Sequence, residues 1–579
     1  MTPTILSPGA TATGIETDPS AIRLIAETHP TDPEIVFPGR HFRLTAVTLS
    51  DGSDLRNELV QESEWLLHPN ETLRLRGNLF CLERLETAQQ VILLLPEPLP
   101  HARPEPSEVD LTVVLDRHTG VHLQTGPGDW VQLCCGAGPV ARARTLQRWQ
   151  RQQRPDTPIH QRANFLSNTW GDRSRDGRMS HTFVAGEIEA AGRLGVDVVQ
   201  LDDGWQRGIT VNSTRAAEGG VWEGFWHADP RFWTPHPQRF PEGLEPLVKL
   251  AAAQGVGLGL WFAPDSWNDF VHWEKDADTV LGFYRNWGVR QVKIDGIKVH
   301  SAAGLRNLRS FIDKVLRESQ GEVAFDLDIT AETRPGHFGM MSCGPLFVEN
   351  RYTDWLSYWP HFTLRTVWQL TRWIDPLRLR MEFLNPLRNQ TLYENDPLGP
   401  AMYPPETLFA TVMCVNPLGW FEVTGLSDPV FAALQPLVNL WRQHRDRMAA
   451  CTLVPIGGCP DGHNFSGFLM LPPEGSEGGY LLLFRGITAA GTAEIPLPTP
   501  KPTPISKPIR IAIGAGTPAT INPVVKVPDS AITGPTDRSI PPVRITQVMP
   551  TAMMALIDTC RAMFSRFAPV RNLSLAKIM

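Results

Sequence analysis

The stretch Val289-Arg290-Gln291-Val292-Lys293-Ile294-Asp295-Gly296 is an apolar run of strand length that stops at a lysine, a carboxylate and a glycine. Buried parallel strands of α/β barrels end in this way, because the polar side chains at their carboxyl ends reach the mouth of the barrel. The stretch therefore predicts a barrel strand. It also places Asp295 where the catalytic groups of such barrels lie.

Asp295 is the candidate nucleophile. A carboxylate at a strand end can attack a sugar carbon and form a covalent ester, provided that a second carboxyl group faces it across the bond to be cleaved. The alternative is that Asp295 caps the helix that follows, which is a common role for aspartate. The neighbouring strands decide between the two interpretations.

Strand-like and helix-like segments alternate between about residues 160 and 425, which is typical of parallel β/α units. Helix periodicity is clear at Ile188–Leu194 and Leu305–Leu316. Eight units over about 260 residues match a closed (β/α)8 TIM barrel. The eight candidate strands are Asn164–Trp170, Asp197–Asp203, Gly257–Pro264, Val289–Asp295, Glu322–Thr330, Leu346–Asn350, Arg380–Pro386 and Asn416–Glu422.

The sequence before the barrel is β-rich. Short apolar runs at Phe42–Val47, Gln90–Leu95 and Leu111–Leu115 are separated by Pro, Gly and Asp turns, which predicts an N-terminal β-sandwich over residues 1–155. The helix-prone segment Ala141–Arg154 ends at Pro155 and connects this sandwich to a catalytic barrel over residues 156–445.

A predicted helix at Phe431–Ala450 follows the last strand of the barrel and leads into the next domain. Runs at Gly467–Leu471, Gly479–Phe484 and Ile509–Ile513 then predict a smaller, antiparallel C-terminal β-sandwich within residues 446–579. This region also has Pro-rich loops, and the apolar segment Met549–Phe564 predicts a packed terminal helix.

Bulk composition narrows the function classes. The net charge of −7 is mild and the basic residues are scattered, so we expect neutral substrates and no nucleic-acid partner. Cys134 and Cys135 are adjacent and Cys451 and Cys459 lie eight apart, so no cysteine spacing predicts a metal site, and we expect no metal and no cofactor. Without an evident signal peptide or bilayer-spanning run, we expect a cytoplasmic protein that does not bind membranes, and homo-oligomerisation stays open.

Polar or aromatic side chains end strand after strand of the predicted barrel. So many in register are difficult to explain as helix caps alone, and the carboxyl ends of the strands build the active site in such barrels. The groups are Asn168 and Trp170; Asp202, Asp203 and Trp205; Trp261 and Asp265; Lys293 and Asp295; Asp326 and Asp328; Glu349, Asn350 and Arg351; Glu382 and Asn385; and Glu422.

Three of these strand ends resemble the α-galactosidase clan of retaining glycoside hydrolases, nearest to glycoside hydrolase family thirty-six. The resemblance covers about residues 160 to 425. It rests on Leu201-Asp202-Asp203-Gly204-Trp205, Trp261-Phe262-Ala263-Pro264 and Val292-Lys293-Ile294-Asp295. It implies a β-sandwich before the barrel, a smaller β domain after it, and Asp295 as the nucleophile.

The resemblance also implies roles for the neighbours of Asp295. Asp202 and Asp203 would hold the O4 and O6 hydroxyls of galactose, because ionised carboxylates are strong acceptors. Lys293 would donate to ring hydroxyls, or else form a buried ion pair with Asp295. Trp170 and Trp261 would form sugar-stacking walls, or else fill the core. For the aspartate pair, the alternative is that one caps a helix and one binds Arg or Lys.

Two segments differ from the family pattern. The usual Cys-x-Gly-Gly-Gly element after the fifth strand is replaced by Asp326–Arg334, and the Ser-Asp-Asp or Ser-Asp-Asn segment that carries the acid/base is replaced by Phe347–Trp355. Within the latter, Asp354 follows Arg351 in a loop and is the preferred general acid, because loop-borne catalytic groups are usual on barrels. Glu349, at the predicted end of the sixth strand, is the other candidate, and otherwise it would bind a sugar hydroxyl or Arg351.

These expectations describe a retaining, exo-acting α-galactosidase that acts on a galactoside or oligosaccharide through two carboxyl groups. Two alternatives stay open. One is galactosyl transfer to a second sugar, as in the raffinose-synthase relatives. The other is a barrel that binds carbohydrate without cleaving it.

Overall fold

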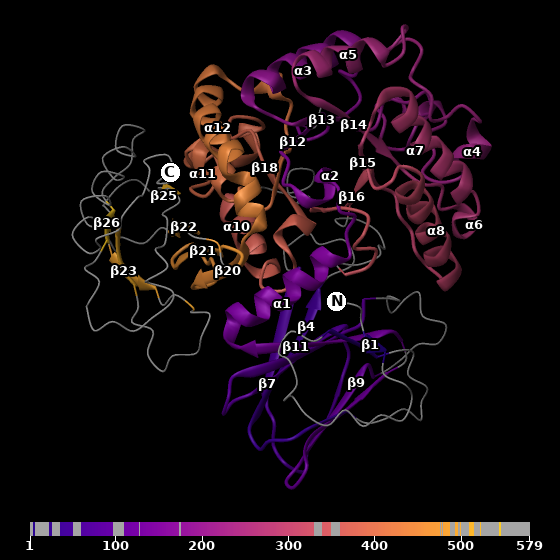
Figure 1. Ribbon diagram of the computed structural model, residues 1–579. Helices are drawn as coiled ribbons and strands as arrows, with labels where there is room; N and C mark the ends of the chain where they lie inside the picture. Colours follow the sequence, from indigo (N-terminus) through magenta and orange to yellow (C-terminus); the bar gives the residue numbers. More distant parts are fainter. Residues whose placement is uncertain are drawn as a thin grey trace.

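Figure 1 shows the computed structural model of the 579-residue chain. The residues that it describes are 4–5, 22–25, 35–49, 59–96, 109–126, 128–172, 175–328, 338–348, 359–474, 476, 479–486, 492–495, 498, 509–513, 521–522 and 543–545.

Eight parallel strands form a closed barrel in which each strand pairs with the next along the chain and the last pairs with the first. All eight predicted strands are present, and the fold class expected from the sequence is confirmed. The strands are β12 (Leu166–Asn168), β13 (Val198–Leu201), β14 (Gly257–Phe262), β15 (Gln291–Ile294), β16 (Ala324–Asp328), β17 (Leu346–Val348), β18 (Leu379–Phe383) and β19 (Asn416–Gly419).

Helices cover the outside of the barrel, and their ends match their sequence. The side chain of Ser180 accepts a hydrogen bond at the start of α3 (His181–Leu194), and Gly195 ends that helix in the left-handed region at φ 94°. Ser301 caps α8 (Ala302–Glu318) in the same way. None of the described helices is both long enough and apolar enough to cross a membrane. The other long helices are α5 (Glu245–Ala253), α7 (Trp273–Trp287), α10 (Pro360–Leu370) and α12 (Asp428–Ala450).

Two sheets precede the barrel and share an apolar core, as the predicted sandwich requires. In strand order, the larger sheet contains β1 (Thr4–Ile5), β2 (Ile22–Ile25), β11 (Trp130–Ala137), β8 (Gln89–Leu94), β7 (Leu79–Arg84), β4 (Phe42–Leu49) and β5 (Val60–Leu66). The smaller sheet contains β3 (Ile35–Phe37), β10 (Gly120–Thr125), β9 (Leu111–Asp116) and β6 (Thr72–Leu75).

Helix α1 (Gly138–Gln152) lies between this sandwich and the barrel (Figure 1). Gln150 Nε2 donates to the carbonyl of Trp373 at 2.9 Å, and Gln147 Nε2 donates to the carbonyl of Leu453 at 2.7 Å. Because Leu453 lies in β20, the helix contacts the sheets on both sides of the barrel as well as the barrel itself.

Two further sheets follow the barrel. The first contains β20 (Thr452–Gly457), β21 (Phe465–Leu471), β22 (Tyr480–Arg485) and β25 (Ile521–Asn522), and its pairs are antiparallel. The second contains β23 (Thr492–Ile495), β24 (Ile509–Ile513) and β26 (Val543–Ile545). The predicted run β24 pairs antiparallel with β23, and it also pairs in parallel with β26, a strand that the sequence did not predict. The predicted helix at Met549–Phe564 lies outside the described residues.

Candidate active site

Asp295 lies directly after β15, at the carboxyl end of the barrel. Trp261 Nε1 donates to Asp295 Oδ2 at 3.3 Å, and the backbone N–H of Gly296 donates to Oδ1 at 2.8 Å. The Asp295 backbone N–H donates to the carbonyl of Phe262 at 3.1 Å, which extends the pairing of β15 with β14. These two donors, one to each carboxylate oxygen, fix the direction of the group.

Exposure distinguishes Asp295 from the other carboxylates at the described strand ends. Its side chain is partly exposed, whereas the others are buried: Asp202, Asp203, Asp265, Asp326, Asp328, Glu382 and Glu422. A nucleophile must approach its target carbon in line with the bond that breaks, which favours a carboxylate with an exposed face. Among these described groups Asp295 is therefore the candidate nucleophile with the most exposed side chain.

Lys293 and Asp202 form a buried ion pair across the barrel mouth. Lys293 Nζ lies 3.0 Å from Asp202 Oδ2 and 3.7 Å from Asp328 Oδ2. Asn168 Nδ2 donates to the same Asp202 oxygen at 2.7 Å. The ammonium group of Lys293 also lies over the ring of Phe347 at 4.4 Å, where the negative face of the ring attracts it. The structure thus brings together two of the predicted site residues, 91 positions apart in the chain.

Asp203 directs both carboxylate oxygens toward its own loop. Gln206 Nε2 donates to Oδ1 at 2.7 Å, and the hydroxyl of Thr210 donates to Oδ2. Burial raises the pKa of Asp203 to about 7, although these two hydrogen bonds partly oppose the rise. Asp203 therefore differs from Asp202 in its partners. It also lines a small pocket together with Asp176, Arg215, His236 and Arg239.

Tryptophans form the wall beside Asp295. Trp261 is almost fully buried and holds Asp295 through its indole N–H. Trp222 is partly exposed, and its ring centroid lies 6.1 Å from that of Trp261. Gly296, which has a positive φ of 64°, lies beside Trp222: a Cβ added there would lie 3.5 Å from the indole. No sequence pattern pointed to Trp222, because it lies in the long segment between β13 and α5.

Trp170 lies just after β12, in a different cluster of side chains from Trp261. It is partly exposed and packs against a small buried cluster that includes Phe347 and Trp420. The same two rings face Lys293 Nζ, at 4.4 Å for Phe347 and 5.1 Å for Trp420. Trp170 is therefore the more accessible of the two predicted tryptophans, and Trp420 is a neighbour of the site that the sequence analysis did not single out.

A group of buried carboxylates lies near the ends of β12 and β19. Burial raises the pKa of Asp172 to about 7, and the negative charges of Glu422 and Glu187 add to the rise. Arg178 pairs with Glu422 in this group. The backbone N–H of Glu422 donates to Asp172 Oδ2 at 3.1 Å. These contacts connect the loop after β12 to the loop after β19. The two loops lie next to the strand pair that closes the barrel.

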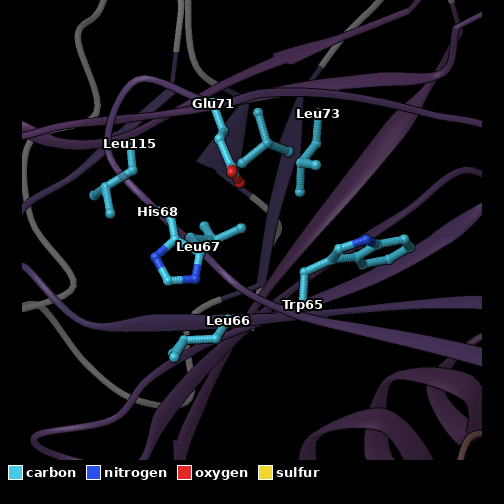
Figure 2. Close-up of a pocket in the computed structure, with 8 residues that line it drawn as sticks. Trp65, Leu66, Leu67, His68, Glu71, Leu73 and Leu115 are labelled. Atoms are coloured by element: carbon cyan, nitrogen blue, oxygen red, sulfur yellow. The ribbon is translucent and has the colours of Figure 1, made fainter.

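The remaining predicted site residues, Glu349, Arg351 and Asp354, lie outside the described residues. A further pocket lies in the N-terminal sandwich, where Trp65, Leu73 and Leu115 surround Glu71 and His68 (Figure 2). Its lining contains one carboxylate, so it lacks the pair that glycoside cleavage requires. The barrel mouth therefore stays the candidate active site.

Comparisons with known proteins identify related structures and one short sequence match. No family model matches the chain. An Escherichia coli α-galactosidase is 31% identical over 86 residues, which is 15% of this chain and 10% of that enzyme. The chain thus spans a small part of this curated relative.

Solved structures resemble the chain over most of its length. The family 36 α-galactosidase AgaA from Geobacillus stearothermophilus is 12% identical with a TM-score of 0.57, over 81% of this chain and 70% of that one. The α-galactosidase from Lactobacillus brevis is 12% identical with a TM-score of 0.60, over 83% of this chain and 70% of that one. At such low identity the likeness defines the fold. The chain therefore has the fold of the glycoside hydrolase family 36 α-galactosidases.

Proposed function

We propose that this protein is a retaining, exo-acting α-galactosidase that cleaves terminal α-galactosides by double displacement. The observation that carries the proposal is Asp295, a partly exposed carboxylate that accepts a hydrogen bond on each oxygen, whereas the other carboxylates at the described strand ends are buried. The fold shared with family 36 α-galactosidases supports the substrate class. Variants of AgaA have been crystallised in complex with raffinose and with stachyose, and both sugars are α-galactosides.

In the first step, Asp295 attacks the anomeric carbon and forms an ester bond while the bond from that carbon to the leaving oxygen breaks. A carboxylic acid gives its proton to the leaving oxygen. In the second step, water attacks the same carbon, its proton goes to the same acid/base residue, and the ester bond to Asp295 breaks. Two inversions at one carbon retain the α configuration.

Asp354 is our proposed acid/base residue, with Glu349 as the other candidate. A retaining enzyme would hold the acid about 5 to 5.5 Å from the carboxyl group of Asp295. Asp202 and Lys293 would bind the galactose hydroxyls as an acceptor and a donor, and Trp170 would stack on the apolar face of the sugar. Trp261 would not touch the sugar; it would orient Asp295 through its hydrogen bond to that carboxylate.

Turnover of nitrophenyl α- and β-glycosides tests this proposal. We expect cleavage of the α-galactoside, with little cleavage of the α-glucoside or the β-galactoside. Proton NMR during the reaction should show α-galactose before the anomers equilibrate. No turnover of any α-galactoside, or initial release of β-galactose, would contradict it. A transfer product as the main product in excess acceptor sugar would instead support the transferase alternative.

Two alanine variants identify the acid. Loss of the true acid should slow a substrate with a poor leaving group far more than nitrophenyl galactoside, whose phenolate leaves unprotonated. Azide added to that variant should then take the place of water in the second step and release α-galactosyl azide from the activated substrate, because the second inversion restores the α configuration. We expect this behaviour from Asp354→Ala. If Glu349→Ala shows it instead, the acid is Glu349.

A further inference from the structure

His227, Asp265 and His272 meet beside the barrel mouth, although they lie 38 and 7 positions apart in the sequence. Each offers one ligand atom, and these atoms all lie within 4.8 Å of one another. His227 lies in the short helix α4 (Phe225–Ala228), Asp265 follows β14, and His272 lies just before α7. The expectation of no metal site was based on the spacing of the cysteines. This group contains no cysteine, so that expectation does not apply to it.

Asp265 is fully buried, and only one of its two carboxylate oxygens accepts hydrogen bonds in the described part of the chain. Its Oδ1 accepts hydrogen bonds from the backbone N–H of Gly224 at 2.7 Å and of Trp267 at 3.3 Å. Its Oδ2 is buried without a hydrogen-bond partner in the described part of the chain, and so is Nε2 of His272. A buried carboxylate oxygen and a buried imidazole nitrogen left in this state each cost free energy, and a cation between them would remove both costs.

The backbone around the group is built to bring these atoms together. Asn268, Asp269 and Phe270 have successive φ values of 49°, 59° and 60°, a left-handed turn that returns His272 toward Asp265. Such a conformation costs energy for a phenylalanine, and it persists where the surroundings impose it. Here Phe270 is buried, and Ser301 Oγ donates to Asp269 Oδ1 at 2.8 Å.

A second layer of contacts orients the group. The carboxylate of Asp276 accepts from the backbone N–H of Asp265 at 3.0 Å and from Trp226 Nε1 at 2.9 Å. Trp226 precedes His227 in α4, so Asp276 ties the two ligand-bearing segments to each other. Trp267 stacks on the His272 ring at 5.8 Å and meets the His227 ring edge-on at 4.5 Å. Outer contacts of this kind orient the ligands in protein metal sites.

From these contacts we propose that His227, Asp265 and His272 bind a zinc ion. Two imidazole nitrogens and one carboxylate oxygen suit Zn²⁺, whereas Ca²⁺ and Mg²⁺ prefer oxygen ligands alone. Bonds of about 2.0 to 2.2 Å in tetrahedral geometry bring ligand atoms to roughly 3.4 Å from one another, so the distances between ligand atoms, now within 4.8 Å, would shorten by at most about 1.4 Å on binding. The exposed side of His227 leaves room for water as the fourth ligand.

The ion would join the segment after β13 to the segment after β14. The first of these segments carries Trp222, which lies against Trp261 and Gly296 beside Asp295. Zinc would therefore hold one wall of the candidate active site in place without touching the reacting atoms. The zinc site stands independently of the proposed α-galactosidase activity, since its ligands have no part in that chemistry.

Zinc binding to the full chain tests the proposal directly. The protein is treated with a chelator, dialysed, and titrated with ZnCl₂ in a calorimeter near neutral pH. We expect one equivalent to bind, and the thermal midpoint to rise with it. His227→Ala and His272→Ala should each weaken binding by at least about tenfold, since each removes one ligand. The exposed His463, replaced by alanine, is the matched control and should leave binding unchanged.

X-ray absorption at the zinc edge of the wild-type protein provides a measurement that does not depend on the folding of any variant. Nitrogen and oxygen ligands at about 2.0 Å would support the site, whereas sulfur at about 2.3 Å would assign the zinc to cysteines and overturn it. The proposal also fails if the wild-type protein binds no zinc, or if His272→Ala binds it as tightly as the wild type.

Discussion

One carboxylate oxygen of Asp202 accepts hydrogen bonds from a lysine ammonium and from an asparagine amide, and all three side chains are buried. Lys293 Nζ lies at 3.0 Å and Asn168 Nδ2 at 2.7 Å. Removing one partner of a buried ion pair leaves the other charge uncompensated, which costs more than the pair itself contributes. Asp202 therefore compensates the charge of Lys293 and fixes the position of its ammonium group.

We expect Asp202→Asn to lower kcat/KM for a nitrophenyl α-galactoside by about 100-fold, because a charged acceptor in a dry site contributes a few kcal/mol. Steady-state kinetics measure this, and a thermal midpoint close to that of the wild type shows that the barrel is intact. Unchanged kinetics together with a lower midpoint would assign Asp202 a purely structural role.

Asp203 predicts a pH dependence of stability. Burial raises its pKa from 3.8 to about 7 in the folded protein, so the folded state holds a proton that the unfolded state has released between these values. Stability from this group is therefore present at low pH and is lost as the pH rises through about 7. Asp203→Asn mimics the protonated side chain and removes this dependence.

Thermal midpoints at about pH 5.5 and about pH 8 measure the effect. Relative to wild type, Asp203→Asn should gain about 2 kcal/mol between the two pH values, which is roughly 2 °C for a chain of this length. The difference between the two proteins cancels the titration of all other groups. A constant difference between the midpoints at both pH values would show that Asp203 is ionised throughout.

At the scale of elements, the inside of the barrel contains a charged layer below the site. Arg380 Nε donates to Asp326 Oδ1 at 2.5 Å, and both side chains are fully buried. Gln291 Nε2 donates to the other Asp326 oxygen at 2.7 Å, and Arg380 Nη2 donates to Asn164 Oδ1 at 2.6 Å. These contacts link the strands β15, β16 and β18 across the barrel interior.

Asp326→Ala should lower the free energy of unfolding by about 3 to 5 kcal/mol, since it leaves the guanidinium of Arg380 buried and uncompensated. Asp278→Ala is the matched control, because Asp278 is itself exposed in its pair with Lys314, and such a pair contributes about 1 kcal/mol or less. Equal thermal midpoints for the two variants would show that the charged layer contributes no more than a surface pair.

Strand positions were predictable because each strand is a short apolar run that ends in polar residues. Their lengths were less so: β12 spans Leu166–Asn168, against the predicted Asn164–Trp170, since the end residues leave the ladder for side-chain contacts. The contact of Lys293 with Asp202 was not predictable, because the ion pair with Asp295 was equally compatible with the sequence. The His227, Asp265 and His272 group depends on a left-handed turn that no periodicity encodes.

At the scale of the whole molecule, α1 couples the flanking sheets to the barrel through Asp375. Arg151 Nε and Arg154 Nη2 each lie 2.6 Å from a different oxygen of this fully buried carboxylate. Burial opposes ionisation, yet the two guanidinium groups hold the pKa of Asp375 below its ordinary value. The sequence predicted this helix as a connection between domains, but not its contact with β20 beyond the barrel.

Asp375→Asn should lower the thermal midpoint far more than Asp446→Asn, which disrupts a half-exposed pair with Arg162. The buried Arg154 loses its counter-charge in the first variant, at a cost of about 3 to 5 kcal/mol, whereas the second costs about 1 kcal/mol or less. Scanning calorimetry measures both midpoints. Similar small shifts in both variants would mean that α1 does not depend on this charge pair.

The central claim is that Asp295 is the nucleophile of an α-galactoside-cleaving barrel. The most direct test compares initial rates of nitrophenyl α-galactoside hydrolysis by Asp295→Asn and by Asp278→Asn, a surface change of the same chemistry, in protein of equal thermal midpoint. We predict that Asp295→Asn loses at least about 1,000-fold in rate while Asp278→Asn matches the wild type. An Asp295→Asn variant that keeps more than about a tenth of the wild-type rate would contradict the account.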